Sequence, residues 1–339
     1  MKRLIAVAGA IVLALASAGA SAQDAPVTLR LSHWVPPSHP LHAALVAWAK
    51  SINEESHGSI TITIFPAQQL GKAFDHYDMA RDGIADITDV SPGYQPGRFP
   101  IIALGSVPFL VANAKGGSAA LHEWYSKYAA VEMKDVHFCS AHFHDPGTFH
   151  STKQITVPTD LHGLKIRVAT DTIGRFVVGL GGTTVNASAP ESRDVIARGV
   201  ADAITFPWGS IFLFGIDKVV KYHLDMPLYV TPFVDVMNKE RYESLSPAQK
   251  KVIDDHCTPE WSQRIASPWA DFEAAGRTKM KAEPGHVMIE PTPAQVAEWR
   301  KAAAPLTAAW ATDVRKVGGN PDQILAEFQA AMKKHGAAY

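Results

Sequence analysis

Two successive runs of alternating strand and helix patterns constrain the fold of this chain more than any other feature. The first run opens with 27–32, where apolar and polar residues alternate, and passes through a helical pattern over 41–52 to a second alternating strand at 59–65. A helical pattern around Tyr77 and a short strand at 84–87 complete a β-α-β-α-β series. Such a series predicts a parallel sheet covered by helices.

A second series of the same kind begins near Gly147. Its predicted strands lie at 165–168, 184–185 and 203–206, separated by helical patterns. A further strand-like run at 229–237 is expected to carry the chain back to the first sheet. Because 339 residues are too many for one compact core, we predict two α/β domains.

The last third of the chain is predicted to be mostly helical. Ser246 followed by Pro247 is typical of a helix start. The helical pattern continues to about Ala282, and a helix of that length could brace two domains. We expect Pro259 and Pro268 to kink or break it.

The N-terminus has the pattern of a secretory signal peptide. Lys2 and Arg3 precede an apolar run over 4–18, and Ala20-Ser21-Ala22 supplies small residues for cleavage. We predict a signal peptide over 1–22 and an exported, periplasmic protein, since no later run is long and apolar enough to span a membrane.

Charge and cysteine content exclude some classes of protein. Removing Lys2 and Arg3 leaves 30 basic against 33 acidic residues, a net charge of −3. This balance does not favour binding to nucleic acid or to an anionic membrane. Cys139 and Cys257 lie far apart in the sequence, and we favour two separate buried thiols over a bridge between them.

A set of short motifs runs in a fixed order from the mature N-terminus to beyond residue 250. They are HWVPPSHPLH (33–42), FPAQQLG (65–71), RDGIADI (81–87), PGRFP (96–100), VPFL (107–110), DLHGLKIRV (160–168), GLGGTTVNASAPESRDVIARGVADA (179–203), DKVVKYH (217–223) and SPAQKKVI (246–253). Each motif alone is weak. Together they resemble the periplasmic substrate-binding proteins of TRAP transporters, of the dicarboxylate-binding (DctP) type.

The resemblance implies a type II-like periplasmic binding protein of two α/β domains, with strands that cross between the domains and a long helix that spans both. We place domain I at 23–146 plus about 233–275, and domain II at 147–232 plus about 276–339, with the ligand cleft between them. The resemblance also implies an organic acid as ligand, membrane permease subunits as partners and no cofactor. We expect a monomer.

The stretch Leu164 to Val168 has the alternation of a strand, which places Lys165 and Arg167 on one face. In the family that this chain resembles, the arginine of this motif forms a salt bridge with the ligand carboxylate, which implies that role for Arg167. A guanidinium offers a planar fork that matches a carboxylate with two parallel hydrogen bonds. The alternative is a structural pair with an acid such as Asp202, and Lys165 is expected to be solvated.

Three positions depart from the family pattern in the same direction. Phe149 stands where many members carry a second arginine, and Phe206 stands at an asparagine position, with Trp208 beyond it. Trp34 occupies a position that is often small or polar. An aromatic wall would bind a ring, and a second carboxylate facing Phe149 would lack a partner. We therefore expect an aromatic or hydrophobic monocarboxylate. In the alternative, these aromatic residues are ordinary core residues and the ligand is a small dicarboxylate or a hydroxy or keto acid.

Three polar residues are weaker candidates for ligand contact. Ser91 and Tyr94 follow the third predicted strand, where open α/β sheets place ligands, and Asn186 follows the strand at 184–185. A plain loop role stays open for each of them.

Other functions find less support in the sequence. His142, His144 and His150, with Asp145, suggest a metal, but no cysteine pair or HExxH helix accompanies them, so no metal site is predicted. No nucleophile motif is present, so we predict that the protein is not an enzyme. An exported receptor that presents its ligand to a sensor kinase would have the same binding chemistry.

Overall fold

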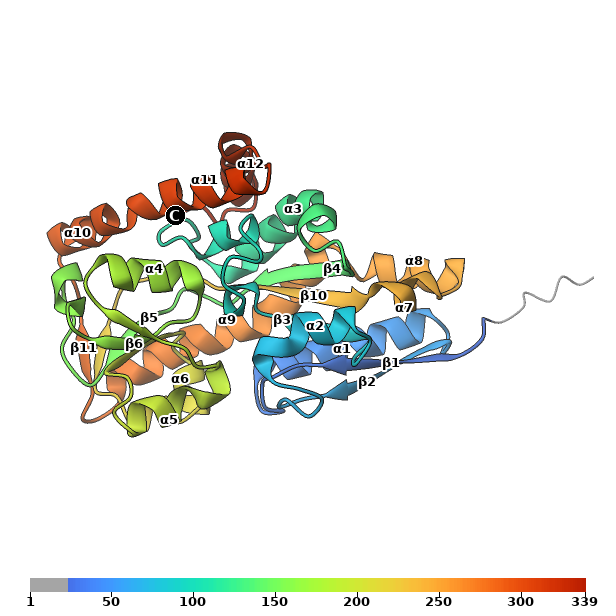
Figure 1. The fold of residues 1–339 in the computed structure, drawn as a ribbon. Coiled ribbons are helices and arrows are strands. Elements are labelled where there is room, and N and C mark those ends of the chain that lie inside the picture. The colour runs from blue at the N-terminus through green and yellow to red at the C-terminus, as the bar shows by residue number, and fades with distance from the viewer. Residues whose placement is uncertain (1–23) are drawn as a thin grey trace, which may run out of the picture.

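The computed structural model describes residues 24–339 and contains two mixed sheets with helices around them (Figure 1). This architecture confirms the predicted two-domain α/β fold. The signal peptide predicted over 1–22 lies outside the described residues. Within residues 24–339, every helix is too short or too polar to cross a bilayer.

The first sheet has five strands in the order β2-β1-β3-β10-β4. Its strands are β1 (Val27–Ser32), β2 (Ile60–Phe65), β3 (Ile87–Val90), β4 (Val136–Phe143) and β10 (Pro232–Asn238). β1 pairs in parallel with β2 and β3, and β10 returns antiparallel between β3 and β4, as the run at 229–237 predicts. The strand expected at 84–87 begins only at Ile87. Just before β3, the Asp86 backbone N–H donates to the Arg30 carbonyl (2.9 Å), and the Asp86 carboxylate accepts a hydrogen bond from the Arg30 backbone N–H (2.7 Å).

The second sheet has six strands in the order β11-β9-β5-β8-β6-β7. Its strands are β5 (Thr148–Ser151), β6 (Lys165–Arg167), β7 (Thr183–Val185), β8 (Ala203–Phe206), β9 (Tyr222–Leu224) and β11 (Val287–Ile289). β6 pairs in parallel with β7 and β8, and β5 pairs antiparallel with β8 and β9. Figure 1 shows the two sheets side by side along the molecule.

Twelve α-helices cover the sheets within residues 24–339. They are α1 (Pro40–Glu55), α2 (His76–Arg81), α3 (Ala114–Glu132), α4 (Asp171–Gly179), α5 (Ser192–Ala197), α6 (Ser210–Leu213), α7 (Lys239–Glu243), α8 (Pro247–Asp255), α9 (Pro259–Ala282), α10 (Pro293–Ala303), α11 (Pro305–Lys316) and α12 (Pro321–Lys334).

The helix α9 spans both parts of the molecule (Figure 1). It packs against α1, α3 and β4 on one side and against α6 on the other. Near its end, Arg277 and Lys281 form ion pairs with Asp225 at the end of β9, at 2.6 and 2.8 Å. The helical pattern breaks at Pro259 as expected, since α8 ends at Asp255 and α9 begins at Pro259, whereas the expected break at Pro268 is wrong. Pro259 occupies the first turn, where no intrahelical N–H is lost, and α9 continues through Pro268, with buried residues on both sides of it.

The C-terminal helix α12 packs against α3, beside the first sheet. The indole N–H of Trp124 on α3 donates to the carbonyl of Ile324 on α12 (3.1 Å). This last helix, which we expected in domain II, thus contacts a helix of domain I. The amphipathic pattern of α12 indicates a buried face, and it does not say which layer that face covers.

Cys139 on β4 and Cys257, just before α9, form a disulfide across 118 residues. The expectation of two separate thiols is wrong. Spacing along the chain says little about a contact that the packing of α9 on β4 creates.

Candidate functional site

A cavity lies where the carboxyl ends of strands from both sheets meet. The first sheet contributes residues that follow β1 and β3, and the second contributes residues at the ends of β6 and β8. The residues that line it are Trp34, His39, Ser91, Tyr94, His144, Arg167, Ala169, Ala189, Phe206, Pro207, Ser210, Phe214, Tyr229, Thr231, Phe233 and Trp269. This is the position at which open α/β sheets bind ligands.

The guanidinium of Arg167 lies at this cavity with only 1 % of the residue exposed. Its Nε–H donates to the carbonyl of Ala187 (2.9 Å), and Nη1 and Nη2 donate to the Thr205 carbonyl (3.4 Å) and to the Tyr94 hydroxyl (3.0 Å). A guanidinium has five N–H donors, so one remains free on each of Nη1 and Nη2. Two such donors are what a carboxylate with two oxygens requires.

No carboxylate among residues 24–339 lies within ion-pair distance of Arg167. Asp202, the alternative partner, instead pairs with Lys153 (3.1 Å) and accepts a hydrogen bond from the Lys165 backbone N–H (2.9 Å). Lys165 is exposed, as expected for a solvated charge. A buried cation without a counter-ion is costly, so the cavity is arranged for an anion.

The Tyr94 hydroxyl links the two sheets at this point. It accepts hydrogen bonds from Arg167 and from the Ala189 backbone N–H (2.9 Å), which leaves its own O–H free to donate. Ser91 Oγ, also at the cavity, is buried and makes no hydrogen bond within the described chain. This hydroxyl can hydrogen-bond a ligand.

The rest of the cavity is largely aromatic. We define the aromatic wall as Trp34, Phe206, Phe233 and Trp269, all of which line the space and are at least 95 % buried. The Phe233 ring lies 6.0 Å from that of Trp34 and 5.2 Å from that of Trp269, between centroids. The Arg167 guanidinium carbon lies 5.5 Å from the Phe206 ring centroid, within the range of a cation–π contact.

Two histidines at the cavity are neutral. Burial lowers the pKa of His39 to about 3 and that of His144 to about 4. Among the described residues that line the space, Arg167 is therefore the only cation near neutral pH. One permanent charge suits an anion with one carboxylate and an apolar body.

Five of the eight predicted site residues lie together at this cavity: Trp34, Ser91, Tyr94, Arg167 and Phe206. The other three do not line it. The placement of Phe149 in its wall is wrong, because Phe149 packs on Trp299, 5.7 Å between centroids, in a buried core cluster. Trp208 turns instead toward His150, at 4.9 Å between centroids. Asn186 is exposed in a depression that shares Tyr94 and Ala169 with the cavity.

The family assignment follows from a comparison with known proteins. Residues 31–313 match the family model DctP, described as bacterial extracellular solute-binding protein, family 7. The chain belongs to this family.

Solved TRAP solute-binding proteins share the fold of this DctP-family protein closely. One from Rhodoferax ferrireducens T118, in complex with copurified benzoate, is 30 % identical, with a TM-score of 0.86 and coverage of 91 % of this chain and 98 % of that one. One from a marine metagenome, specific for aromatic acid ligands and bound to metahydroxyphenylacetate, is 31 % identical, with a TM-score of 0.84 and coverage of 91 % and 99 %. One from Bordetella bronchiseptica, with bound (R)- and (S)-mandelate, is 28 % identical, with a TM-score of 0.85 and coverage of 91 % and 99 %.

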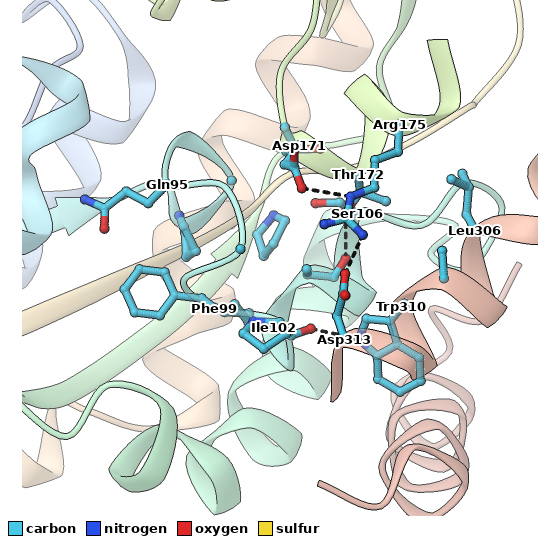
Figure 2. A pocket seen from close by; sticks show the side chains of 18 residues that line it. Gln95, Phe99, Ile102, Ser106, Asp171, Thr172, Arg175, Leu306, Trp310 and Asp313 are labelled. Atoms are coloured by element: carbon cyan, nitrogen blue, oxygen red, sulfur yellow. Dashed lines mark hydrogen bonds and ion pairs between the residues drawn. The ribbon is translucent and has the colours of Figure 1, made fainter. Parts of the chain in front are cut away.

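The DctP-family protein contains a second cavity, which lies beside α4 and α11 (Figure 2). Its cation, Arg175, already pairs with two carboxylates, those of Asp171 (3.0 Å) and Asp313 (Figure 2). Because these acids neutralise Arg175, this cavity offers no unpaired charge to an anion. The cavity at Arg167 is therefore the candidate ligand site.

The residues at the cavity that the sequence did not indicate as site residues include His39, Tyr229, Phe233 and Trp269. His39 lies inside the HWVPPSHPLH motif, which could have indicated it. The others come from β10, from the loop before it and from the middle of α9, where an apolar residue is equally typical of a core.

The histidines considered for a metal do not converge. His150 contacts His223 (2.8 Å), whereas His144 contacts Thr231 (3.0 Å). Asp145 accepts a hydrogen bond from the Ala114 backbone N–H (2.8 Å). His142 points instead between Asp89 and Asp235.

Proposed function

We propose that this protein binds an aromatic monocarboxylate in the cavity at Arg167 and delivers it to the permease subunits of a TRAP transporter. The single observation that carries the proposal is a buried Arg167 without an acidic partner, beside an aromatic wall. The ligand carboxylate takes the two free N–H donors of Arg167 and the O–H of Tyr94. The ring packs against the aromatic wall.

Energetics favour one carboxylate over two. Buried aromatic pairs add about 0.5–1.5 kcal/mol each beyond the area that they bury. A second carboxylate would be taken out of water without a cation to meet it, because His39 and His144 are neutral. Succinate and malate are therefore disfavoured. The aromatic acids bound by three relatives with TM-scores of 0.84 to 0.86 support the same ligand class.

We further propose that the protein works in the periplasm, after removal of residues 1–22, and that the parts of the chain on either side of the cavity close around the ligand. Closure excludes water and strengthens the pair between Arg167 and the carboxylate. Delivery to a permease is what its family membership supports. A receptor for a sensor kinase would use the same cavity, and nothing at the site favours that reading.

Isothermal titration calorimetry of the untagged mature protein tests the proposal. The protein is unfolded, dialysed and refolded first, so that any carried-over ligand is removed. We expect benzoate, mandelate or a hydroxyphenylacetate to bind, and benzamide, which lacks the charge, to bind far more weakly. Tight binding of succinate or malate without any response to an aromatic acid would overturn the proposed ligand class.

Two variants on one strand provide the matched control. Arg167→Met keeps most of the side-chain volume and removes the charge, and we expect at least about 100-fold weaker binding, or ~2.7 kcal/mol. Lys165→Met removes a positive charge two residues away, at an exposed position, and should leave the Kd unchanged. Equal losses in both variants would show that general charge, and not the fork of Arg167, attracts the ligand.

A further inference from the structure

A cluster of ionisable side chains lies inside the first sheet, behind the ligand cavity. Asp89 on β3, His142 on β4 and Asp235 on β10 are 0 %, 0 % and 3 % exposed. Asp89 and Asp235 stand directly opposite each other in the antiparallel pairing of β3 with β10. Like charges in this position destabilise a sheet unless something compensates them.

Most polar atoms of the cluster lack partners within the described chain. Both ring nitrogens of His142 and Oδ1 of Asp235 are buried and make no hydrogen bond, and the Asp89 carboxylate has only the Trp34 indole N–H as a neighbouring donor. The Ser140 hydroxyl satisfies the remaining oxygen, Asp235 Oδ2, at 2.5 Å. Buried polar groups are nearly always paired, so a set of unpaired atoms from three facing side chains requires a bound species.

The distances within the cluster are too long for direct hydrogen bonds between His142 and the two acids. His142 Nε2 lies 3.4 Å from Asp89 Oδ2, and His142 Nδ1 lies 3.6 Å from Asp235 Oδ2. Both separations exceed the roughly 2.7–3.2 Å of an N–H···O hydrogen bond. Two ligands that each stand ~2.1 Å from a zinc ion, at the tetrahedral angle, lie about 3.4 Å apart, as His142 Nε2 and Asp89 Oδ2 do. One ion takes a single ring nitrogen, so only one of the two separations can be that of a ligand pair.

We propose that Asp89, His142 and Asp235 bind one divalent transition-metal cation, with Zn²⁺ as its first candidate. Each residue can offer one ligand atom, and these atoms lie within 4.8 Å of one another. Two carboxylates balance the two positive charges, so the occupied site is neutral overall. An imidazole with two carboxylates suits zinc or manganese better than calcium or magnesium.

The cation would lie next to the ligand cavity without being part of it. The His142 ring stacks on Phe233, 5.4 Å between centroids and 23° between planes, and Phe233 belongs to the aromatic wall. An ion on His142 would hold this ring, and through it Phe233, in one orientation. The inference does not depend on the proposed ligand, because neither Arg167 nor Tyr94 takes part in it.

Metal analysis of the untagged mature protein tests the inference. After treatment with a chelator and dialysis, the protein is incubated with Zn²⁺, passed through a desalting column and analysed by mass spectrometry for metal content. We expect one zinc per chain, and a melting temperature that rises with Zn²⁺ concentration. Co²⁺ is a second probe on the same unmodified protein, and its visible absorption should report a mixed nitrogen and oxygen ligand set.

Variants inside and outside the cluster separate this site from surface binding. Asp89→Asn and His142→Gln should each lower the retained zinc from one per chain to below about 0.1, which corresponds to at least a hundredfold loss in affinity. His137→Gln removes a half-buried histidine on β4, the strand of His142, beside Asp254, and should keep one zinc. If the unmodified protein retains no zinc or cobalt and its melting temperature does not respond to either ion, the inference is wrong whatever the variants do.

Discussion

The Nη2 atom of Arg167 and the hydroxyl oxygen of Tyr94 lie 3.0 Å apart, although one residue belongs to the second sheet and the other follows a strand of the first. Because Tyr94 also accepts the Ala189 N–H, this one hydroxyl joins the two sides of the cavity. The contact positions Arg167 and leaves a donor free for the ligand.

Loss of this hydroxyl should weaken ligand binding. In Tyr94→Phe the ring remains, but Arg167 and the Ala189 N–H lose an acceptor and the ligand loses a donor. We expect about a tenfold rise in Kd for an aromatic acid, or ~1.4 kcal/mol, measured by calorimetry. Tyr128→Phe removes a hydroxyl that contacts Glu327 on another face, and it should have no effect on the Kd. An unchanged Kd in Tyr94→Phe would exclude the hydroxyl from ligand binding.

Two phenylalanines of similar burial should respond differently to the same substitution. Phe206 lines the cavity and Phe149 packs on Trp299. Phe206→Leu removes the ring contact with the ligand, and we expect about a 2- to 10-fold loss of affinity for an aromatic acid. Phe149→Leu should leave the Kd unchanged and lower the free energy of unfolding by under about 1.5 kcal/mol. If Phe149→Leu changes the Kd and Phe206→Leu does not, the ligand binds on the face of the second sheet that carries Phe149, and the proposed cavity is wrong.

The disulfide should contribute substantially to stability. It closes a long loop, since Cys139 and Cys257 are 118 residues apart. In Cys139→Ala/Cys257→Ala we expect the free energy of unfolding to fall by about 2–5 kcal/mol, although chain entropy is only one account of the effect. Guanidinium-induced unfolding, with and without reductant, measures this loss of unfolding free energy. Reductant should destabilise the unmodified protein and leave the double variant unaffected, and equal curves for both proteins would contradict the prediction.

Protonation of His39 should destabilise the protein in acid. Burial lowers the pKa of His39 to about 3 from an ordinary value of 6.5, and its Nδ1 caps α1 by accepting the Leu41 N–H (3.1 Å). Between these two pKa values the unfolded chain binds more protons than the folded one. The contribution to stability is therefore fully present above pH 6.5, and it is lost as the pH falls toward 3.

His39→Asn tests this prediction, because asparagine can still cap the helix but does not titrate. Unfolding free energies measured from pH 6.5 down to 4.5 should fall less steeply in the variant, by up to about 1.4 kcal/mol per pH unit. His57→Asn changes an exposed histidine and should retain the original slope. Parallel slopes for the unmodified protein and His39→Asn would show that His39 is not the group that protonates.

Local patterns predicted much of the fold. β1, β6 and β8 follow their predicted bounds closely, because alternation with period 2 reports a strand directly. What these patterns could not report was long-range packing. The Cys139–Cys257 pair, the contact of α12 with α3 and the passage of α9 through Pro268 each depend on surfaces that meet only in the folded chain.

At the candidate site, too, local sequence patterns did not report which side chains meet in the folded chain. Arg167, which a strand motif and a family resemblance both indicated, lies at the cavity, and its contact with a ligand stays a prediction. Phe149 was misplaced because alternation in β5 separates its two faces without saying which face meets the cavity. Its neighbour His150 points to Trp208, and Phe149 points the other way, to Trp299. Trp269 was missed since an aromatic residue in the middle of α9 is as typical of a core as of a binding wall.

The bridge between β4 and the start of α9 also determines how the chain responds to proteolysis. Strands β5 to β9, and the helices among them, all lie between Cys139 and Cys257. A protease that cuts once in this part of the molecule opens a ring and does not release a fragment. The nicked protein keeps its original mass on a gel without reductant, and its two pieces separate only after the bridge is reduced.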